Sequence, residues 1–120
     1  MGSEPKPTIT YEEFAKLDLR VATVLACENH PNADRLLKLT VDLGPLGQRQ
    51  ICAGVRAFYS PEQMVGRQIA VVANLLPRTI RGEISQGMLL AASAMAGTPE
   101  GGEQLRDLVI LGLERPAPPG

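Results

Sequence analysis

Hydrophobic and polar residues alternate most clearly along residues 36–43. One side of an extended chain would carry the apolar set Leu37, Leu39, Val41 and Leu43, and the other would carry Lys38, Thr40 and Asp42. This two-residue period predicts a β-strand with one buried face. Five further stretches rich in Val, Ile and Leu predict strands over residues 19–27, 48–54, 67–75, 87–93 and 108–113.

Two short helices are predicted from the residues that would start them. Thr10 and Glu13 form a capping-box pattern, which predicts a helix over residues 11–17. Ser60 and Gln63 repeat the pattern, so a second short helix should follow the third strand. Three strands, a helix and two more strands are typical of an all-β, five-stranded OB-fold barrel with short helices, here with an added C-terminal strand segment. Six short strands also fit another small barrel or a sandwich.

The connection between the fourth and fifth predicted strands is long and cationic. Residues 74–88 read NLLPRTIRGEISQGM, whereas a plain hairpin needs only a short turn such as Asn-Gly. Pro77 stiffens the backbone beside Arg78, and Arg81 follows within the same connection. In OB-folds the loops after the first and fourth strands bind ligands. We therefore interpret residues 74–88 as a ligand-binding loop.

Charge is distributed unevenly along the chain. The 120 residues suggest one domain, over residues 11–120, preceded by a leader or tag remnant at residues 1–10. The formal net charge is −1, but residues 35–81 hold seven basic and two acidic side chains, a local charge of +5. The segments on either side carry −3 each. The cationic middle favours an anionic partner, although clustering of this kind also occurs on ordinary solvated surfaces.

The sequence lacks the usual signatures of an enzyme, a metal protein or a membrane protein. His30 is the single histidine, in a predicted turn, and no CxxC spacing occurs, so we expect no catalytic residue and no metal. No phosphate-binding or dinucleotide-binding glycine motif occurs, and no cofactor is expected. The apolar flanks of Cys27 and Cys52 predict buried, reduced thiols and a cytoplasmic location. No apolar run approaches the roughly 18 residues of a membrane span.

Five blocks of the sequence, in order along the chain, resemble a known family. They read LDLRVATVL, HPNADRLLKLTVDLG, ICAGV, VGRQIAVVANLLPRTIRG and SQGMLLAAS. They resemble the tRNA-binding domain of bacterial methionyl-tRNA synthetases, endothelial monocyte-activating polypeptide II, stand-alone structure-specific tRNA-binding proteins and CsaA-type export chaperones. The resemblance covers residues 11–119, nearly the whole chain.

The resemblance implies an OB-fold that binds the shape of tRNA rather than a sequence. It also implies which positions face the RNA or shape that surface, and these are Asn74, Arg78, Arg81, Ser85, Gln86 and Met88, with Lys38 similar to a family position on the binding face. A homodimer is implied as well, and we expect its interface to use the N-terminal segment and residues 108–113. Guanidinium groups bind phosphates in bidentate fashion and Met88 offers a soft surface to an unstacked base, which agrees with these positions.

The leading interpretation is a non-catalytic tRNA-binding module, either free-standing or joined to the catalytic domain of a methionyl-tRNA synthetase in the same chain. The few aromatic residues favour recognition of phosphates and shape over base stacking. Two alternatives stay open. One is a CsaA-type chaperone for unfolded polypeptides, which would need a large exposed apolar groove. The other is a protein dimerisation module.

Overall fold

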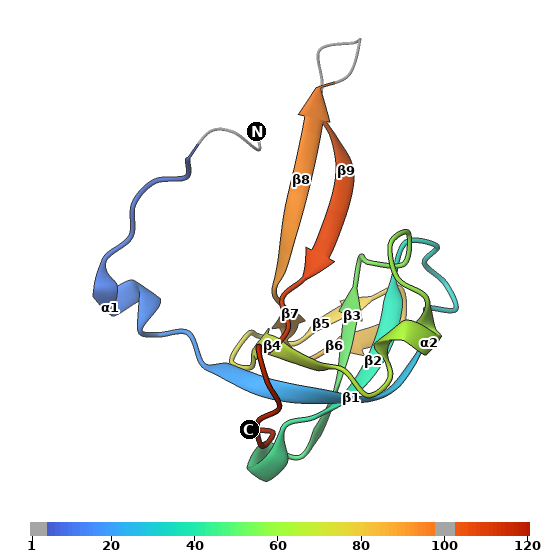
Figure 1. Cartoon of the computed structure of the whole chain (residues 1–120), viewed down its shortest axis with the longest axis horizontal. Coiled ribbons are helices and arrows are strands. Elements are labelled where there is room, and N and C mark those ends of the chain that lie inside the picture. The colour runs from blue at the N-terminus through green and yellow to red at the C-terminus, as the bar shows by residue number, and fades with distance from the viewer. Residues whose placement is uncertain (1–4, 98–102) are drawn as a thin grey trace.

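The architecture rests on a five-stranded antiparallel sheet. The computed structural model describes residues 5–97 and 103–120. The strands follow the order β3-β2-β1-β4-β7, with bounds β1 Leu19–Asn29, β2 Leu37–Asp42, β3 Gln48–Ala53, β4 Gln68–Val72 and β7 Met88–Leu89 (Figure 1). Leu37, Leu39 and Val41 are fully buried, so the alternation along β2 gives the burial that the sequence predicts.

The sheet curls into a nearly closed barrel. β1 is long enough to pair with β2 and with β4, and a register shift between Val24 and Ala26 marks a bulge that lets it bend. The opposite edge closes where the Gln86 N–H donates to the Gln50 carbonyl and the Cys52 N–H donates to Ser85 Oγ. The five-stranded OB-type barrel is therefore confirmed.

Both predicted helices are present but last only one turn. α1 covers Tyr11–Phe14 and α2 covers Pro61–Met64, each with the capping box that its sequence indicates. α1 is thus shorter than the predicted span of residues 11–17. α2 lies between β3 and β4 in the chain and buries Met64 completely. No helix in the described ranges is long and apolar enough to cross a membrane.

Two predictions about the second half of the chain are corrected. The connection after β4, interpreted from the sequence as a loop, folds into a hairpin of β5 (Arg78–Ile80) and β6 (Glu83–Ser85). The single strand predicted over residues 87–93 is two strands, β7 and β8 (Ala91–Gly97), separated at Leu90. The Leu90 N–H donates to the Ala70 carbonyl and its own carbonyl accepts from the Leu111 N–H, so Leu90 is held beside β4 where the chain passes from β7 to β8.

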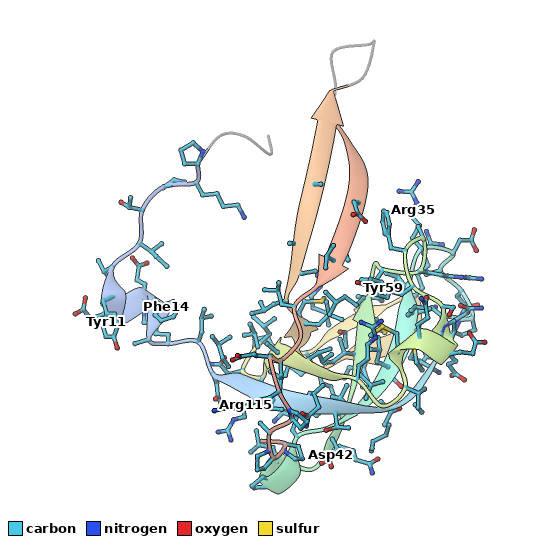
Figure 2. The ribbon with its side chains drawn as sticks, in the orientation of Figure 1. Tyr11, Phe14, Arg35, Asp42, Tyr59 and Arg115 are labelled. Atoms are coloured by element: carbon cyan, nitrogen blue, oxygen red, sulfur yellow. The ribbon has the colours of Figure 1, made fainter. Side chains whose placement is uncertain are left out.

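An antiparallel hairpin of β8 and β9 (Glu103–Ile110) projects from the barrel (Figure 1). The strand predicted over residues 108–113 thus starts earlier. Residues 96–104, whose polar composition predicts a loop, belong partly to β8 and β9. The centre of that loop, residues 98–102, lies outside the described residues. The N-terminal segment also extends away from the barrel, and it carries the neighbouring rings of Tyr11 and Phe14 (Figure 2).

Candidate nucleic-acid interface

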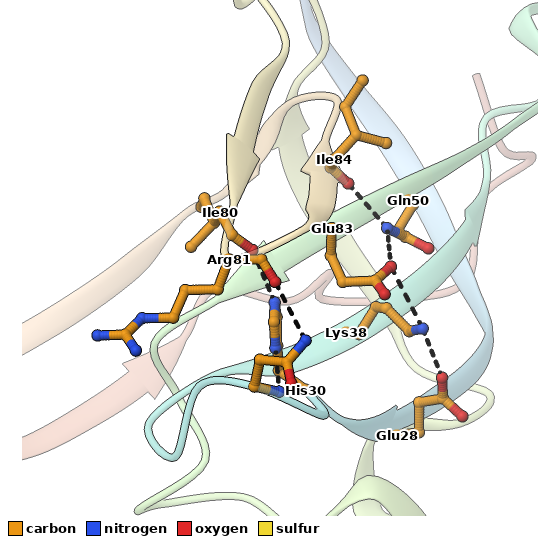
Figure 3. A network of polar contacts seen from close by, with 9 residues as sticks. Glu28, His30, Lys38, Gln50, Ile80, Arg81, Glu83 and Ile84 are labelled. Atoms are coloured by element: carbon orange, nitrogen blue, oxygen red, sulfur yellow. Dashed lines mark hydrogen bonds and ion pairs between the residues drawn. The ribbon is translucent and has the colours of Figure 1, made fainter.

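The β5–β6 hairpin carries both arginines that the sequence singles out. Arg78 begins β5 and Arg81 is the first residue of the two-residue turn, and both side chains are exposed. Among the residues that the structure describes, no ion pair is formed by either guanidinium group. The Arg81 side chain points away from the neighbouring polar network (Figure 3). Two cations are thus presented to solvent on one small hairpin.

A polar network fixes this hairpin to the barrel. Lys38 Nζ lies 2.7 Å from Glu28 Oε1 and 3.4 Å from Glu83 Oε1, which joins β1, β2 and β6. The Gln50 amide donates to Glu83 Oε1 at 3.2 Å and to the Ile84 carbonyl at 2.9 Å. The hydrogen bond to Glu28 raises the pKa of Lys38 above its usual value. The charged Lys38 side chain therefore holds the hairpin against the barrel, and its contact with RNA stays a prediction.

Asn74 ties the N-terminal segment to the end of β4. Its Oδ1 accepts from the Asp18 N–H at 2.9 Å, and its Nδ2 donates to the Lys16 carbonyl at 2.6 Å. The Ala73 N–H adds a bond to the Asp18 carbonyl at 2.8 Å. Both ends of the Asn74 amide are thus bonded to backbone, which gives this residue a role in shaping the surface.

Ser85 and Gln86 also bond to the protein itself. Ser85 is buried, and its hydroxyl accepts from the Cys52 N–H at 3.0 Å and donates to the Gly87 carbonyl at 3.2 Å. Gln86 Oε1 accepts from the Gln50 N–H at 3.1 Å. These two side chains close the barrel beneath the hairpin.

An apolar concavity of about 690 Å³ opens beside Arg78. Arg78 and Ile80 stand two positions apart on β5 and both line it, as alternation along a strand requires. Met88 is half-buried, packs against the core and forms part of the wall. Leu76 is 87% exposed, an unusual state for so apolar a side chain. The full lining is Asn74, Leu75, Leu76, Arg78, Ile80, Ser85, Gly87 and Met88.

A second, polar concavity of about 300 Å³ lies between the β1–β2 loop and the hairpin turn. Arg35 and Arg81 both line it, although they stand far apart in the sequence. The sequence interpretation missed Arg35. Its position directly after HPNAD, in the loop that follows the first strand, was the available signal, because that loop is the other ligand loop of an OB-fold.

The two cysteines differ in burial. Cys52 is buried as predicted, whereas Cys27 is only half-buried, because it lies where β1 passes the barrel edge. Burial raises the pKa of the Cys27 thiol to about 11 and also raises the pKa of Cys52. Both groups therefore stay protonated at neutral pH. No cluster of three or more His, Cys, Asp or Glu side chains suited to a metal occurs in the part of the chain described.

Comparison with known families gives a match over most of the chain. A family model described as a putative tRNA binding domain matches residues 19–120. A methionine–tRNA ligase from Chlorobium luteolum is 57% identical over 94 residues, which cover 78% of this chain and 13% of that protein. A methionine–tRNA ligase from Xylella fastidiosa is 47% identical over 115 residues, covering 95% of this chain and 15% of the relative. The chain thus spans a small fraction of the length of these relatives.

Solved structures share the fold. The chaperone CsaA from Bacillus anthracis has a TM-score of 0.74 at 33% identity, covering 93% of this chain and 94% of that one. A MetRS-related protein from Pyrococcus horikoshii has a TM-score of 0.69 at 31% identity, covering 92% of this chain and 94% of that one.

Proposed function

This chain belongs to the putative tRNA-binding domain family, whose matched model is a non-catalytic accessory domain, and from that membership we propose that it binds folded tRNA through the β5–β6 hairpin. The observation that carries the proposal is the exposed pair Arg78 and Arg81 on a hairpin that the Lys38–Glu83–Gln50 network fixes in place. Because the hairpin backbone is already held in place, only the arginine side chains lose conformational entropy when they bind a phosphate.

Recognition would be of shape. Arg78, Arg81 and Arg35 contact backbone phosphates, which carry no sequence information. Lys38, Asn74, Ser85 and Gln86 shape the surface through the bonds described above. Tyr59 is used in packing, because its hydroxyl accepts from the Ile110 N–H at 3.1 Å and its ring carries the Arg67 guanidinium 5.3 Å from its centroid.

The apolar concavity beside Arg78 takes one unstacked base. Its lining is largely apolar and includes the cationic Arg78, which suits a nucleotide with an aromatic face and an adjoining phosphate. The same concavity, together with the likeness to the CsaA chaperone, favours a second candidate, the binding of apolar side chains from unfolded polypeptides. The positive charge of Arg78 in the lining favours the nucleotide.

Competition measurements separate the two candidates. Titration with bulk tRNA in a filter-binding assay should show saturable binding, and an unfolded polypeptide added in excess should not displace it. Leu76→Ser should weaken tRNA binding about 5-fold with an unchanged salt dependence, since it removes apolar contact and no charge. Displacement of tRNA by the polypeptide would support the chaperone candidate instead. So would a Leu76→Ser variant that binds the polypeptide more weakly but binds tRNA as the wild type does.

We place the module beside a synthetase catalytic domain, in the cytoplasm, where it would add to that domain's hold on tRNA. The support is that the similar methionine–tRNA ligases are several times longer than this chain. Addition of the domain in the same polypeptide should lower the KM for tRNA and leave kcat for a saturating substrate unchanged, because it adds affinity outside the reacting site.

The chain forms a homodimer in this proposal. The N-terminal segment exposes apolar side chains that the barrel does not cover, with Tyr11 76%, Ile9 62% and Phe14 49% exposed. Val109 on β9 is 52% exposed and Leu111 is 45% exposed. A second copy of the chain offers the same surfaces in return, as a two-fold interface requires.

Light scattering at micromolar concentration should give twice the single-chain mass of 12.8 kDa. Tyr11→Ser/Phe14→Ser should shift the mass toward the single-chain value, because these side chains contribute only to the interface. The matched control is Leu25→Ser, which removes another exposed apolar side chain from β1 outside that segment. A wild-type mass of one chain, or loss of the dimer in both variants, would contradict the proposed interface.

A further inference from the structure

The turn between β5 and β6 contains a residue that its backbone disfavours. Ile80 pairs with Glu83, which leaves Arg81 and Gly82 as the two turn residues. Their φ angles are 48° and 90°, both positive, as in a type I′ turn. Asn, Asp or Gly normally occupies the first position, because a Cβ atom crowds the backbone in the left-handed region. An arginine is present there instead, so this turn gains from support by other parts of the protein.

Two side chains from the β1–β2 loop supply that support. His30 Nε2 lies 2.8 Å from the Ile80 carbonyl oxygen, and Asn32 Nδ2 donates to the Arg81 carbonyl at 3.3 Å (Figure 3). Two consecutive carbonyls of the turn are therefore bonded from outside the hairpin. His30 is 3% exposed, so its bond is protected from competing water.

The hydrogen bonds of His30 also define the state of its ring. The Asn32 N–H donates to His30 Nδ1 at 3.0 Å, so Nδ1 is the unprotonated acceptor. Nε2 then carries the proton and donates to the Ile80 carbonyl. The single histidine thus joins the two OB ligand loops, one bond fixing its own loop and the other reaching the hairpin.

We propose that His30 and Asn32 are positioning residues that hold the Arg81 turn in the orientation that presents its guanidinium to an RNA phosphate. This inference rests on the proposed function. The concavity that Arg81 lines is formed on its other side by residues 32–36 of the same loop, so the bonds set the separation of Arg81 from Arg35. A phosphate bound between the two arginines requires that separation to be constant.

Two substitutions of His30 test its two hydrogen bonds separately. His30→Gln keeps a donor nitrogen at the same number of bonds from Cα as Nε2, so it can still donate to the Ile80 carbonyl. His30→Asn keeps an acceptor oxygen at the position of Nδ1 and is too short to reach the hairpin. Each variant therefore retains one bond, and only His30→Gln retains the bond to the hairpin.

The test compares the salt dependence of tRNA binding by these variants and by Arg81→Ala, with unfolding curves recorded for each. His30→Asn should lower the slope of log K against log salt by about one phosphate contact, as Arg81→Ala does, and His30→Gln should keep the wild-type slope. Adding Arg81→Ala to His30→Asn should lower the slope no further. A residue that only stabilised the fold would change the unfolding curve and leave the slope of the folded protein unchanged.

The outcomes separate this inference from the function on which it rests. If Arg81→Ala lowers the slope and His30→Asn does not, the positioning role is wrong and tRNA binding by the hairpin stands. If Arg81→Ala itself has no effect, the proposed RNA contact of Arg81 is wrong. Should His30→Asn fail to fold, Asn32→Ala carries the test, since it removes an exposed side chain and its bond to Arg81 and leaves His30 in place. A wild-type slope in Asn32→Ala would then overturn the inference.

Discussion

Replacing Arg78 and Arg81 together with alanine should weaken tRNA binding about 10- to 100-fold at moderate salt. Each guanidinium group that contacts a phosphate contributes a charge-assisted hydrogen bond, and such bonds are among the strongest that proteins form. If about four phosphates are neutralised per site, raising salt from about 50 to 200 mM should cost the wild-type protein on the order of a hundredfold in affinity. The double variant should lose about two contacts from that slope.

The double variant should stay folded and should weaken different tRNA species alike. Both side chains are exposed, so their truncation should change the free energy of unfolding by about 0.5 kcal/mol or less per site. Alanine keeps a Cβ at position 81, so the strain of the left-handed backbone conformation there is unchanged. Species-independent weakening is expected because phosphates carry no sequence information.

Arg115→Ala is the matched control, because it removes one positive charge from an exposed site near the C-terminus (Figure 2). Filter binding over a range of salt concentrations measures all three proteins. An unchanged slope in Arg78→Ala/Arg81→Ala, or an equal loss in Arg115→Ala, would show that the hairpin is not the RNA contact.

Replacing Gly87 with alanine should destabilise the barrel by about 3 kcal/mol. The φ angle of Gly87 is 130°, a conformation that residues with a side chain rarely adopt. An added Cβ would stand 2.8 Å from the Val72 carbonyl oxygen, which is backbone in β4 and cannot move aside without disturbing the β4–β7 pairing. Strain and steric overlap therefore add at this site.

Gly82→Ala is the control that separates these two costs. Gly82 also has a positive φ, 90°, but nothing lies within 4 Å of an added Cβ. It should therefore cost about 1 to 2 kcal/mol, the strain alone. Urea unfolding measured by circular dichroism gives both values. Equal losses in the two variants would mean that the approach of Gly87 to β4 has no energetic importance.

Gly87 and Gly82 differ in whether a ligand could approach the backbone. A glycine in a candidate binding loop suggests room for a ligand to approach, and Gly82 at the exposed turn keeps that possibility. At Gly87 the space is filled by the protein's own β4 backbone. The same residue type thus has two uses within one block, and only the neighbouring strand distinguishes them.

Local patterns determined much of the fold. The alternation along residues 36–43 and the capping boxes at Thr10 and Ser60 depend on contacts within a few residues, so the sequence predicted them correctly. The β5–β6 hairpin was missed because its strands are only three residues long, too short for a period-two pattern to be recognised. Its Arg81-Gly82 turn also departs from the usual Asn-Gly signal.

The sequence by itself determined the barrel, the long cationic connection after β4 and the kinds of side chain in it. Tertiary structure decided which of those side chains remain free. Lys38 and Asn74 were predicted to face the RNA or to shape that surface, and the fold bonds them to partners from distant strands and from the N-terminal segment. His30 looked like a simple turn residue, yet its partner lies 50 positions away at Ile80. A side chain's availability depends on what the fold brings beside it, and local sequence does not contain that information.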